Sequence, residues 1–147
     1  MRFGACDAWL TTMSEVRGET PLKALLEKLA AFSARDDRRF AEAVSLPFVH
    51  LWPDGDLWHH ETSADIDLLR QYAKAGIDAG SFGRTELDEA RLVLDGTELK
   101  AFRVTFTRYT QAGDRISQSA ALWVTVRERG AWKLKLRIGA VPEGASQ

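Results

Sequence analysis

Apolar residues recur at helical spacing in the first third of the chain. Thr20-Pro21 is a typical helix start, because a hydroxyl side chain caps free N–H groups and proline is favoured in the first turn. The apolar stripe that follows consists of Leu22, Leu25, Leu26, Leu29 and Phe32. A second, shorter helix is predicted from Asp36 or Asp37 to Val44, and Pro47 is expected to end it.

The segment FVHLWPDGDLWHHETSAD, residues 48–65, has the pattern of an apolar hairpin that turns at Asp54-Gly55. It contains all 3 histidines of the chain. Thr62 and Ser63 can cap a third helix. The buried stripe of that helix is predicted to be Ile66, Leu69, Tyr72 and Ala73, and the loop after it contains Gly76, Gly80 and Gly83.

Alternating apolar residues predict an antiparallel meander in the rest of the chain. Its strands are expected at 86–94, 99–109, 116–127 and 131–141. Placing Phe102 opposite Leu122, and Val126 opposite Trp132, brings three apolar sets to one core face. These sets are Phe102, Val104 and Phe106; Leu122, Val124 and Val126; and Trp132, Leu134, Leu136 and Ile138.

This order of elements predicts an α+β fold, with three helices packed on one face of a curved, mostly antiparallel sheet. We expect one domain at 20–141, between a flexible N-terminal segment, 1–19, and a C-terminal tail, 142–147. The net charge of −1 lacks the basic excess of proteins that bind nucleic acids or anionic membranes. No apolar run is long enough to cross a bilayer.

The chain has a single cysteine, Cys6, which cannot form an internal disulfide. The first residues also lack the apolar core of a signal peptide, so a reducing, cytoplasmic location is expected. Cys6 is not expected to be a nucleophile, because it lies in an irregular segment with no base positioned beside it.

The order of elements resembles the nuclear transport factor 2-like superfamily, and within it the SnoaL-like, polyketide-cyclase-like branch. The residues that carry the resemblance are PLKALLEKLAAF, DDRRFAEAV and the closing hairpin ALWVTVRERGAWKLKLRI. The resemblance implies a cone of helices against a bent sheet, a cystatin-like fold, with a pocket between them and usually a dimer. Members include ketosteroid isomerases, dehydratases, epoxide hydrolases, cyclases and binding proteins, so this fold does not determine a function.

Polar side chains on the predicted core face need a reason to be buried. Arg108 continues the face of Phe106, Gln118 lies opposite Phe106 in the predicted register, and Tyr72 adds a hydroxyl. The predicted ligand pocket consists of Trp52, Trp58, Tyr72, Phe106, Arg108 and Gln118. The structural alternative is that Arg108 reaches solvent, backbone groups satisfy Gln118, and Tyr72 is a core aromatic.

The three histidines are the candidate catalytic residues. His50 is expected opposite His59 if the hairpin loop has two or four residues, and opposite His60 if it has three. Either pair is a candidate general acid/base, because histidine titrates near neutral pH. Metal binding together with Glu61, and simple packing, are the other interpretations. No spaced metal motif is present, and neither a metal nor a cofactor is predicted.

The outer sheet face is the predicted homodimer interface, because Trp123 is expected to lie there among polar residues, with Arg103 and Thr105. The predicted function is binding of a small, largely apolar molecule by a dimer. The alternative is an isomerase, dehydratase or cyclase that uses a histidine pair on a carbonyl substrate. A protein-interaction module that works through the Trp123 face is a third possibility. A ketosteroid-isomerase mechanism is not favoured, because the predicted core faces of the last three strands carry no carboxylate.

Overall fold

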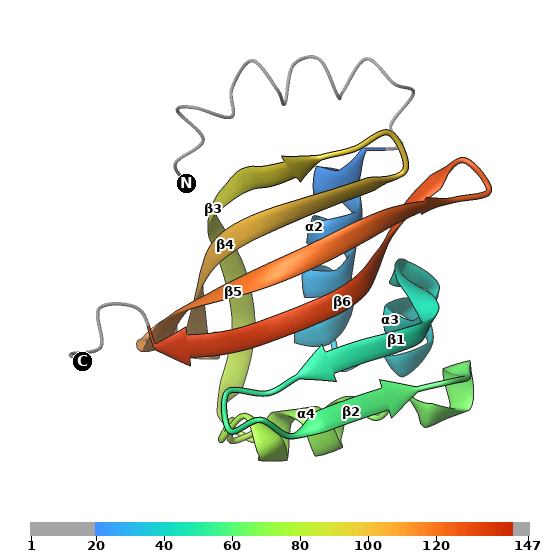
Figure 1. Cartoon of the computed structure of the whole chain (residues 1–147). Coiled ribbons are helices and arrows are strands. Elements are labelled where there is room, and N and C mark those ends of the chain that lie inside the picture. The colour runs from blue at the N-terminus through green and yellow to red at the C-terminus, as the bar shows by residue number, and fades with distance from the viewer. Residues whose placement is uncertain (1–19, 143–147) are drawn as a thin grey trace.

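The computed structural model describes residues 20–142, and in this range three α-helices pack against a six-stranded sheet (Figure 1). The helices are α2 (Pro21–Ser33), α3 (Asp37–Ala43) and α4 (Leu68–Lys74), with a 3-10 turn, η2, at Ser63–Asp65. The strands are β1 (Val44–Leu51), β2 (Leu57–His60), β3 (Phe82–Asp95), β4 (Leu99–Thr110), β5 (Arg115–Glu128) and β6 (Ala131–Pro142). The predicted flexible segment 1–19, with Cys6, lies outside the described residues, as do residues 143–147.

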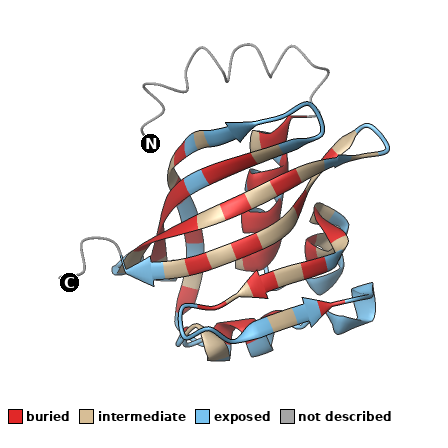
Figure 2. Ribbon diagram, viewed as in Figure 1, coloured by how far each residue is buried: buried red, intermediate tan, exposed pale blue. Residues whose placement is uncertain are grey.

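The sheet has the strand order β2-β1-β6-β5-β4-β3, and β1 pairs with β6 in parallel while the other neighbours are antiparallel. Figure 1 shows α2 lying behind β3–β6, whereas none of the helices described in residues 20–142 lies in front of these strands. Figure 2 shows buried and less buried residues alternating along the front strands, as expected when only one face is covered by helices. The core is therefore a single layer between the sheet and α2, α3 and α4.

The helices begin where capping side chains satisfy their free N–H groups. The Thr20 side chain accepts a hydrogen bond from the Lys23 N–H at 3.0 Å, as predicted. The third helix begins later than predicted, because Thr62 and Asp65 cap only the η2 turn and Asp67 caps α4. Leu69, predicted to be buried, is consequently 60% exposed.

The registers of β4, β5 and β6 correct the predicted faces. Phe102 lies opposite Trp123 rather than Leu122, because Ile116 is an extra residue where β4 and β5 first pair. Val126 lies opposite Lys133, because β5 and β6 are joined by a tight turn at Arg129-Gly130, where φ is 53° and 82°.

The shifted register reverses the predicted orientation of β5. Trp123, predicted on the outer face, is fully buried on the core face at 0% exposure. The predicted dimer contact through an exposed Trp123 is therefore wrong, whereas Arg103 is exposed, as predicted. Thr105, predicted beside it, is only 8% exposed.

An irregularity in the pairing of β5 with β6 then changes which side chains of β6 face the core. Thr125 pairs with Leu134 but Val124 pairs with Leu136, so Lys135 is an extra residue on β6. The alternation restarts after this bulge. Leu134 faces the core as predicted, and beyond the bulge Arg137 takes the core-facing position opposite Trp123. Leu136 and Ile138, predicted as core residues, alternate with Arg137 and lie on the open face.

The β1–β2 hairpin pairs its histidines in neither predicted way. His50 lies opposite Trp58, and His60 lies opposite Phe48. The Trp52 N–H donates to the Asp56 carbonyl at 2.9 Å, which closes the turn at residues 53–55 and sets this register. Both predicted cross-strand pairs, His50 with His59 and His50 with His60, are therefore wrong.

Candidate functional site: a buried cationic pocket

Three cationic side chains lie in the core, and none of them has an acidic partner within residues 20–142. Lys28 of α2, Arg108 of β4 and Arg137 of β6 are 1%, 6% and 3% exposed. Among residues 20–142, no carboxylate forms an ion pair with any of them. Buried charges are normally paired, because a low-dielectric interior disfavours an isolated charge by several kcal/mol. This cluster is therefore the strongest departure from ordinary core chemistry in the described chain.

Aromatic rings supply the immediate surroundings of these cations. The Lys28 Nζ lies 4.4 Å from the centroid of the Trp123 ring, and the Arg137 guanidinium carbon lies 5.7 Å from the same ring. The guanidinium carbons of Arg108 and Arg137 lie 5.0 and 5.7 Å from the ring of Phe106. Such cation–π contacts contribute about 2 kcal/mol each when desolvated, which offsets only part of the cost of burial.

Burial lowers the pKa of each cation, and repulsion from neighbouring cations lowers the pKa of Lys28 and Arg137 further. Burial is the largest cause for Lys28, whose pKa is well below its ordinary value, and Arg137 and Arg108 lower it further. Burial and the nearby Arg108 lower the pKa of Arg137 to about 9, and burial lowers the pKa of Arg108 to about 10. A bound anion would reverse these shifts, because it favours the charged form of every member.

Several polar atoms around the cluster have no hydrogen-bond partner among the described residues. They are the Nε atoms of Arg108 and Arg137, the ring N–H groups of Trp52 and Trp123, and Nδ1 of His50. Elsewhere in the core, both side-chain polar atoms of Gln71 on α4 also lack a partner in this range. A buried donor or acceptor without a partner costs about 1–3 kcal/mol. Most of these groups are donors, so an acceptor-rich molecule would satisfy them.

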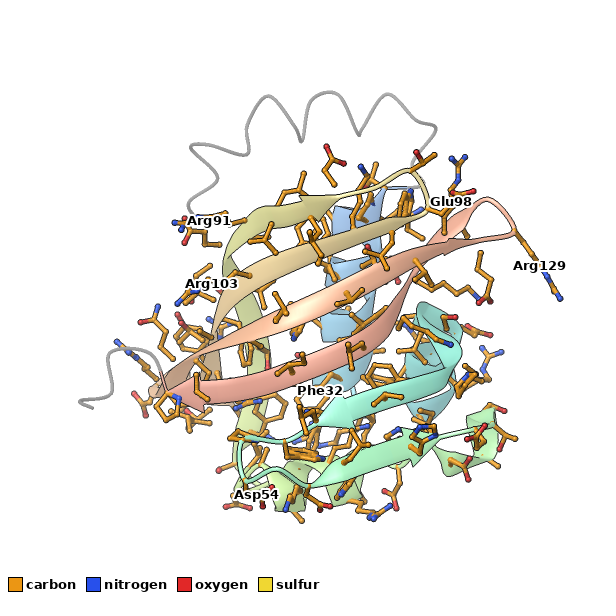
Figure 3. The ribbon with its side chains drawn as sticks, in the orientation of Figure 1. Phe32, Asp54, Arg91, Glu98, Arg103 and Arg129 are labelled. Carbon is orange, nitrogen blue, oxygen red and sulfur yellow. The ribbon has the colours of Figure 1, made fainter. Side chains whose placement is uncertain are left out.

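A small cavity reaches this cluster from the surface. Its volume is about 140 Å³, and it is lined by Trp52, Pro53, Lys74, Ala75, Arg108, Arg137 and Ala140. Its rim is formed by the β1–β2 turn, where Figure 3 labels Asp54 at the edge of the molecule, and by the end of α4. The Lys74 Nζ joins these two elements, at 2.6 Å from Asp54 and 3.4 Å from Asp56.

His50 is the histidine that belongs to this site. It is the register partner of Arg137 across β1 and β6, and its ring stacks on Trp52 at a centroid distance of 3.8 Å. Its Nε2 lies 3.2 Å from the Gly139 carbonyl, so we assign the proton to Nε2 and a free lone pair to Nδ1. Burial, then Arg137 and Lys28, hold the pKa of His50 far below its ordinary value.

The other two histidines have different environments. His60 is buried beside Phe48, with its Nδ1 donating to the Phe48 carbonyl at 3.2 Å, and burial lowers its pKa. His59 points to solvent at 53% side-chain exposure and pairs with Glu61 at 2.9 Å. His59 therefore lies outside the pocket.

The structure separates the predicted pocket residues into three groups. Trp52 and Arg108 line the cavity, and Phe106 packs against its two arginines. Trp58 is half-buried and does not line the cavity, but its ring packs against Trp52, with 4.9 Å between the ring centroids. Tyr72 is a core aromatic.

The Tyr72 hydroxyl donates to the Phe32 carbonyl of α2, and burial raises the pKa of Tyr72 to about 12. Gln118 does not line the cavity, so its predicted place in the pocket is wrong. It pairs with Thr107 across β4 and β5 and donates to Asp88 at 3.3 Å, away from the cavity.

Sequence reasoning missed Lys28, Gln71 and Arg137. Lys28 carries a readable signal, because it lies three residues after Leu25 and four before Phe32, inside the apolar stripe of α2. Gln71 likewise follows the buried Leu68 at helical spacing. Arg137 gives no such signal, because only the bulge at Lys135 turns it inward.

Metal and membrane chemistry find no support in the described part of the chain. Within residues 20–142, no three His, Cys, Asp or Glu side chains gather closely enough to hold a metal ion. None of the helices in this range is long and apolar enough to span a membrane.

No family model and no curated protein matches the sequence. Solved structures do match. A nuclear transport factor 2-like protein with a cystatin-like fold from Novosphingobium aromaticivorans has a TM-score of 0.68 and 14% identity, over 95% of this chain and 90% of that one. A cystatin-like-fold protein of unknown function from Nostoc punctiforme has a TM-score of 0.66 and 13% identity, over 83% and 89%.

A ketosteroid isomerase-like protein from Erwinia carotovora atroseptica has a TM-score of 0.56 and 15% identity, over 82% of this chain and 93% of that one. Identities this low concern the fold alone, and the SnoaL-like branch stays a prediction. The chain therefore has the nuclear transport factor 2-like, or cystatin-like, fold that its order of elements predicted.

Proposed function

We propose that this protein binds a small molecule with an apolar body and an anionic group in the cavity beside Arg108 and Arg137. One observation carries the proposal: Lys28, Arg108 and Arg137 are buried together with no carboxylate partner among residues 20–142. The free energy lost by burying these charges is recovered when a ligand supplies the opposite charge. The proposal replaces the largely apolar ligand expected from the sequence with a charged one.

A carboxylate is the anionic group that we favour. Guanidinium groups bind planar carboxylates through paired N–H groups, and the Nε of each buried arginine has no partner among the described residues. The cavity volume of about 140 Å³ suits a small ligand. The ring of Phe106 and the stacked pair of His50 and Trp52 offer aromatic surfaces to the apolar part.

Thermal denaturation with a ligand panel tests this proposal. The panel contains small aryl and alkyl carboxylates, the matching neutral amides, inorganic phosphate and sulfate. We expect carboxylates to raise the midpoint temperature and their amides to leave it unchanged. A ligand at a hundredfold excess over its Kd stabilises the folded state by about 2.7 kcal/mol. Equal effects of acids and amides, or no effect of either, would contradict the proposal.

We also propose that the protein is a homodimer joined through the open sheet face. The support differs from the predicted Trp123 contact, because apolar side chains now lie on that face. Leu122 and Ile138 flank a hollow of about 260 Å³ that also includes Val141, which is 47% exposed. Apolar patches of this kind mark association surfaces, and closed twofold dimers are the commonest homo-oligomers.

Catalysis by a histidine pair stays a prediction that the geometry does not favour. His50 and His60 are not cross-strand partners, and burial lowers the pKa of both rings. A general base works best when its pKa lies near the working pH. We therefore assign His50 the role of a neutral hydrogen-bond acceptor in the proposed binding site.

A further inference from the structure

We infer that Lys28 is a nucleophilic amine that forms an imine with a ketone or aldehyde carbonyl of the bound carboxylate. The ligand class is then a small oxo acid, held at its carboxylate by Arg137 and Arg108. This inference rests on the proposed function, because the bound carboxylate is the molecule that carries the carbonyl. Lys28 lies beside the cavity rather than on its lining, and it shares the Trp123 ring with Arg137, at 4.4 Å from Nζ and 5.7 Å from the guanidinium carbon.

The position of Lys28 is unusual for a lysine that serves only stability. Its side chain is 1% exposed, and within residues 20–142 no ion pair or hydrogen bond holds its amine. The Nζ lies 4.4, 5.1 and 5.6 Å from the ring centroids of Trp123, Phe32 and Phe40. A lysine surrounded by apolar rings and other cations is the environment that activates an amine as a nucleophile.

The chemistry of the surroundings favours the neutral amine. Burial, Arg137 and Arg108 all lower the pKa of Lys28, so more of its population carries a lone pair. The charge of Lys28 also lowers the pKa of His50, which places the two groups in mutual electrostatic range. The Nδ1 lone pair of His50 has no partner among the described residues and can accept a hydrogen bond from the amine.

The proposed step needs no oxidant, metal or further reactant. The Lys28 lone pair forms a bond to the carbonyl carbon, and the π electrons move to the oxygen, which takes up a proton. That proton comes from the nitrogen, and the second N–H proton of Lys28 leaves with the hydroxyl group. The hydroxyl group leaves as water, so that amine and carbonyl become imine and water.

Reductive trapping tests the inference. Pyruvate, acetoacetate and levulinate place the ketone one, two or three bonds from the carboxylate carbon. Each is incubated with the full-length protein and sodium cyanoborohydride. We expect at least one of them to add a single reduced adduct to the intact mass, and peptide mapping to locate it at Lys28. Lys28→Arg should lose the adduct, whereas Lys23→Arg should keep it, because Lys23 is an exposed lysine of the same helix.

A second variant guards against a folding defect in Lys28→Arg. Arg137→Met keeps Lys28 but removes the proposed carboxylate anchor, so the labelling rate should fall about tenfold or more. Adducts spread over exposed lysines, or labelling of Lys28 at an unchanged rate in Arg137→Met, would overturn the inference.

Calorimetry with propionate, butyrate and pentanoate separates this inference from the proposed function. If these acids bind but no oxo acid labels Lys28, imine formation is wrong and anion binding stands. If they fail to bind and no adduct forms, the proposed function fails, and the imine with it.

Discussion

Arg137 stands directly opposite Trp123 on β6 and β5, with its guanidinium carbon 5.7 Å from the indole centroid, and both side chains face the core. On its other side Arg137 pairs with His50 of β1. A full positive charge therefore lies in the middle of the sheet, between two aromatic side chains. This buried charge destabilises the protein when the cavity is empty, and it can bind an anion. The proposed function is based on these two consequences.

Replacement of Arg137 by methionine should stabilise the empty protein. The variant removes a buried charge but keeps an apolar side chain against Trp123, and replacing buried ions by apolar residues is neutral or stabilising by about 1–4 kcal/mol. Urea denaturation measures the free energy of unfolding. The matched control is Arg129→Met at the exposed β5–β6 turn, which projects away from the body in Figure 3 and should change stability by less than about 0.5 kcal/mol. A loss of several kcal/mol in Arg137→Met would mean that the charge is satisfied in the empty protein.

The empty protein should lose stability as the pH falls below 6.5. His50 has an ordinary pKa of 6.5 when unfolded and a much lower one when folded, so the unfolded chain takes up its proton first. Between pH 6.5 and about 4.5 this group alone lowers the free energy of unfolding by up to about 1.4 kcal/mol per pH unit. His60 has a lowered pKa too and adds to the slope.

Denaturation at a series of pH values measures that slope. His50→Gln should flatten it, because the variant has no titrating group at this position. His59→Gln is the control and should keep it, since His59 is exposed. An unchanged slope in His50→Gln would mean that His50 is protonated in the folded state.

Substitution of Tyr72 by phenylalanine should lower the free energy of unfolding and leave ligand affinity unchanged. The hydroxyl donates to the Phe32 carbonyl within the core, and one such hydrogen bond contributes about 1 kcal/mol. Thermal denaturation and carboxylate titration of the same variant measure the two quantities. A large loss of ligand affinity would mean that Tyr72 contacts the ligand, as the sequence predicted.

Replacement of Ile138 by lysine should produce a monomer. A charge in the centre of the open sheet face opposes burial of that face against a second copy. Multi-angle light scattering measures the mass, and Leu69→Lys is the control, because Leu69 is exposed on α4 at the other layer. A dimeric Ile138→Lys would place the interface elsewhere.

Lys74 should speed the arrival of an anion at the cavity. It lines the cavity and is held beside two carboxylates, Asp54 and Asp56, whose negative charge it offsets. Lys74→Ala should lower the association rate several-fold at low salt and lose this effect at high salt, because steering is screened by ions. Stopped-flow fluorescence of Trp52 and its neighbours follows the reaction. A change confined to the dissociation rate would instead make Lys74 a direct ligand contact.

Sequence reasoning reached the fold because the signals for it are local. The Thr20 cap, the helical stripe to Phe32 and the alternation on β4 depend on neighbouring residues alone. The face on which Trp123 lies depends on one extra residue, Ile116, and that of Arg137 depends on a second, Lys135. A single extra residue in one strand moves the side chains that follow it to the opposite face of the sheet. The alternation of apolar residues does not indicate where such an extra residue occurs.

The candidate site was therefore only half predictable. Arg108 lies on the core side, as predicted, because the pairing of β4 with β5 is regular from Phe102 to Arg108. The sequence shows that Lys28 is a cation within an apolar stripe. Its place in the site depends on Arg108 and Arg137, which only the tertiary structure brings close to it. Three cations from three separate elements make one site, and their meeting is a property of the tertiary fold.

Isothermal titration of phenylacetate and its neutral amide, phenylacetamide, into the wild-type protein and Arg137→Met tests the central claim most directly. The two ligands have nearly the same shape and differ in charge. We predict that the wild-type protein binds the acid at least tenfold more tightly than the amide, and that Arg137→Met loses this preference, since a buried charge contact contributes about 2–5 kcal/mol. Equal affinity of the wild-type protein for acid and amide, or a preference that survives in Arg137→Met, would contradict the account.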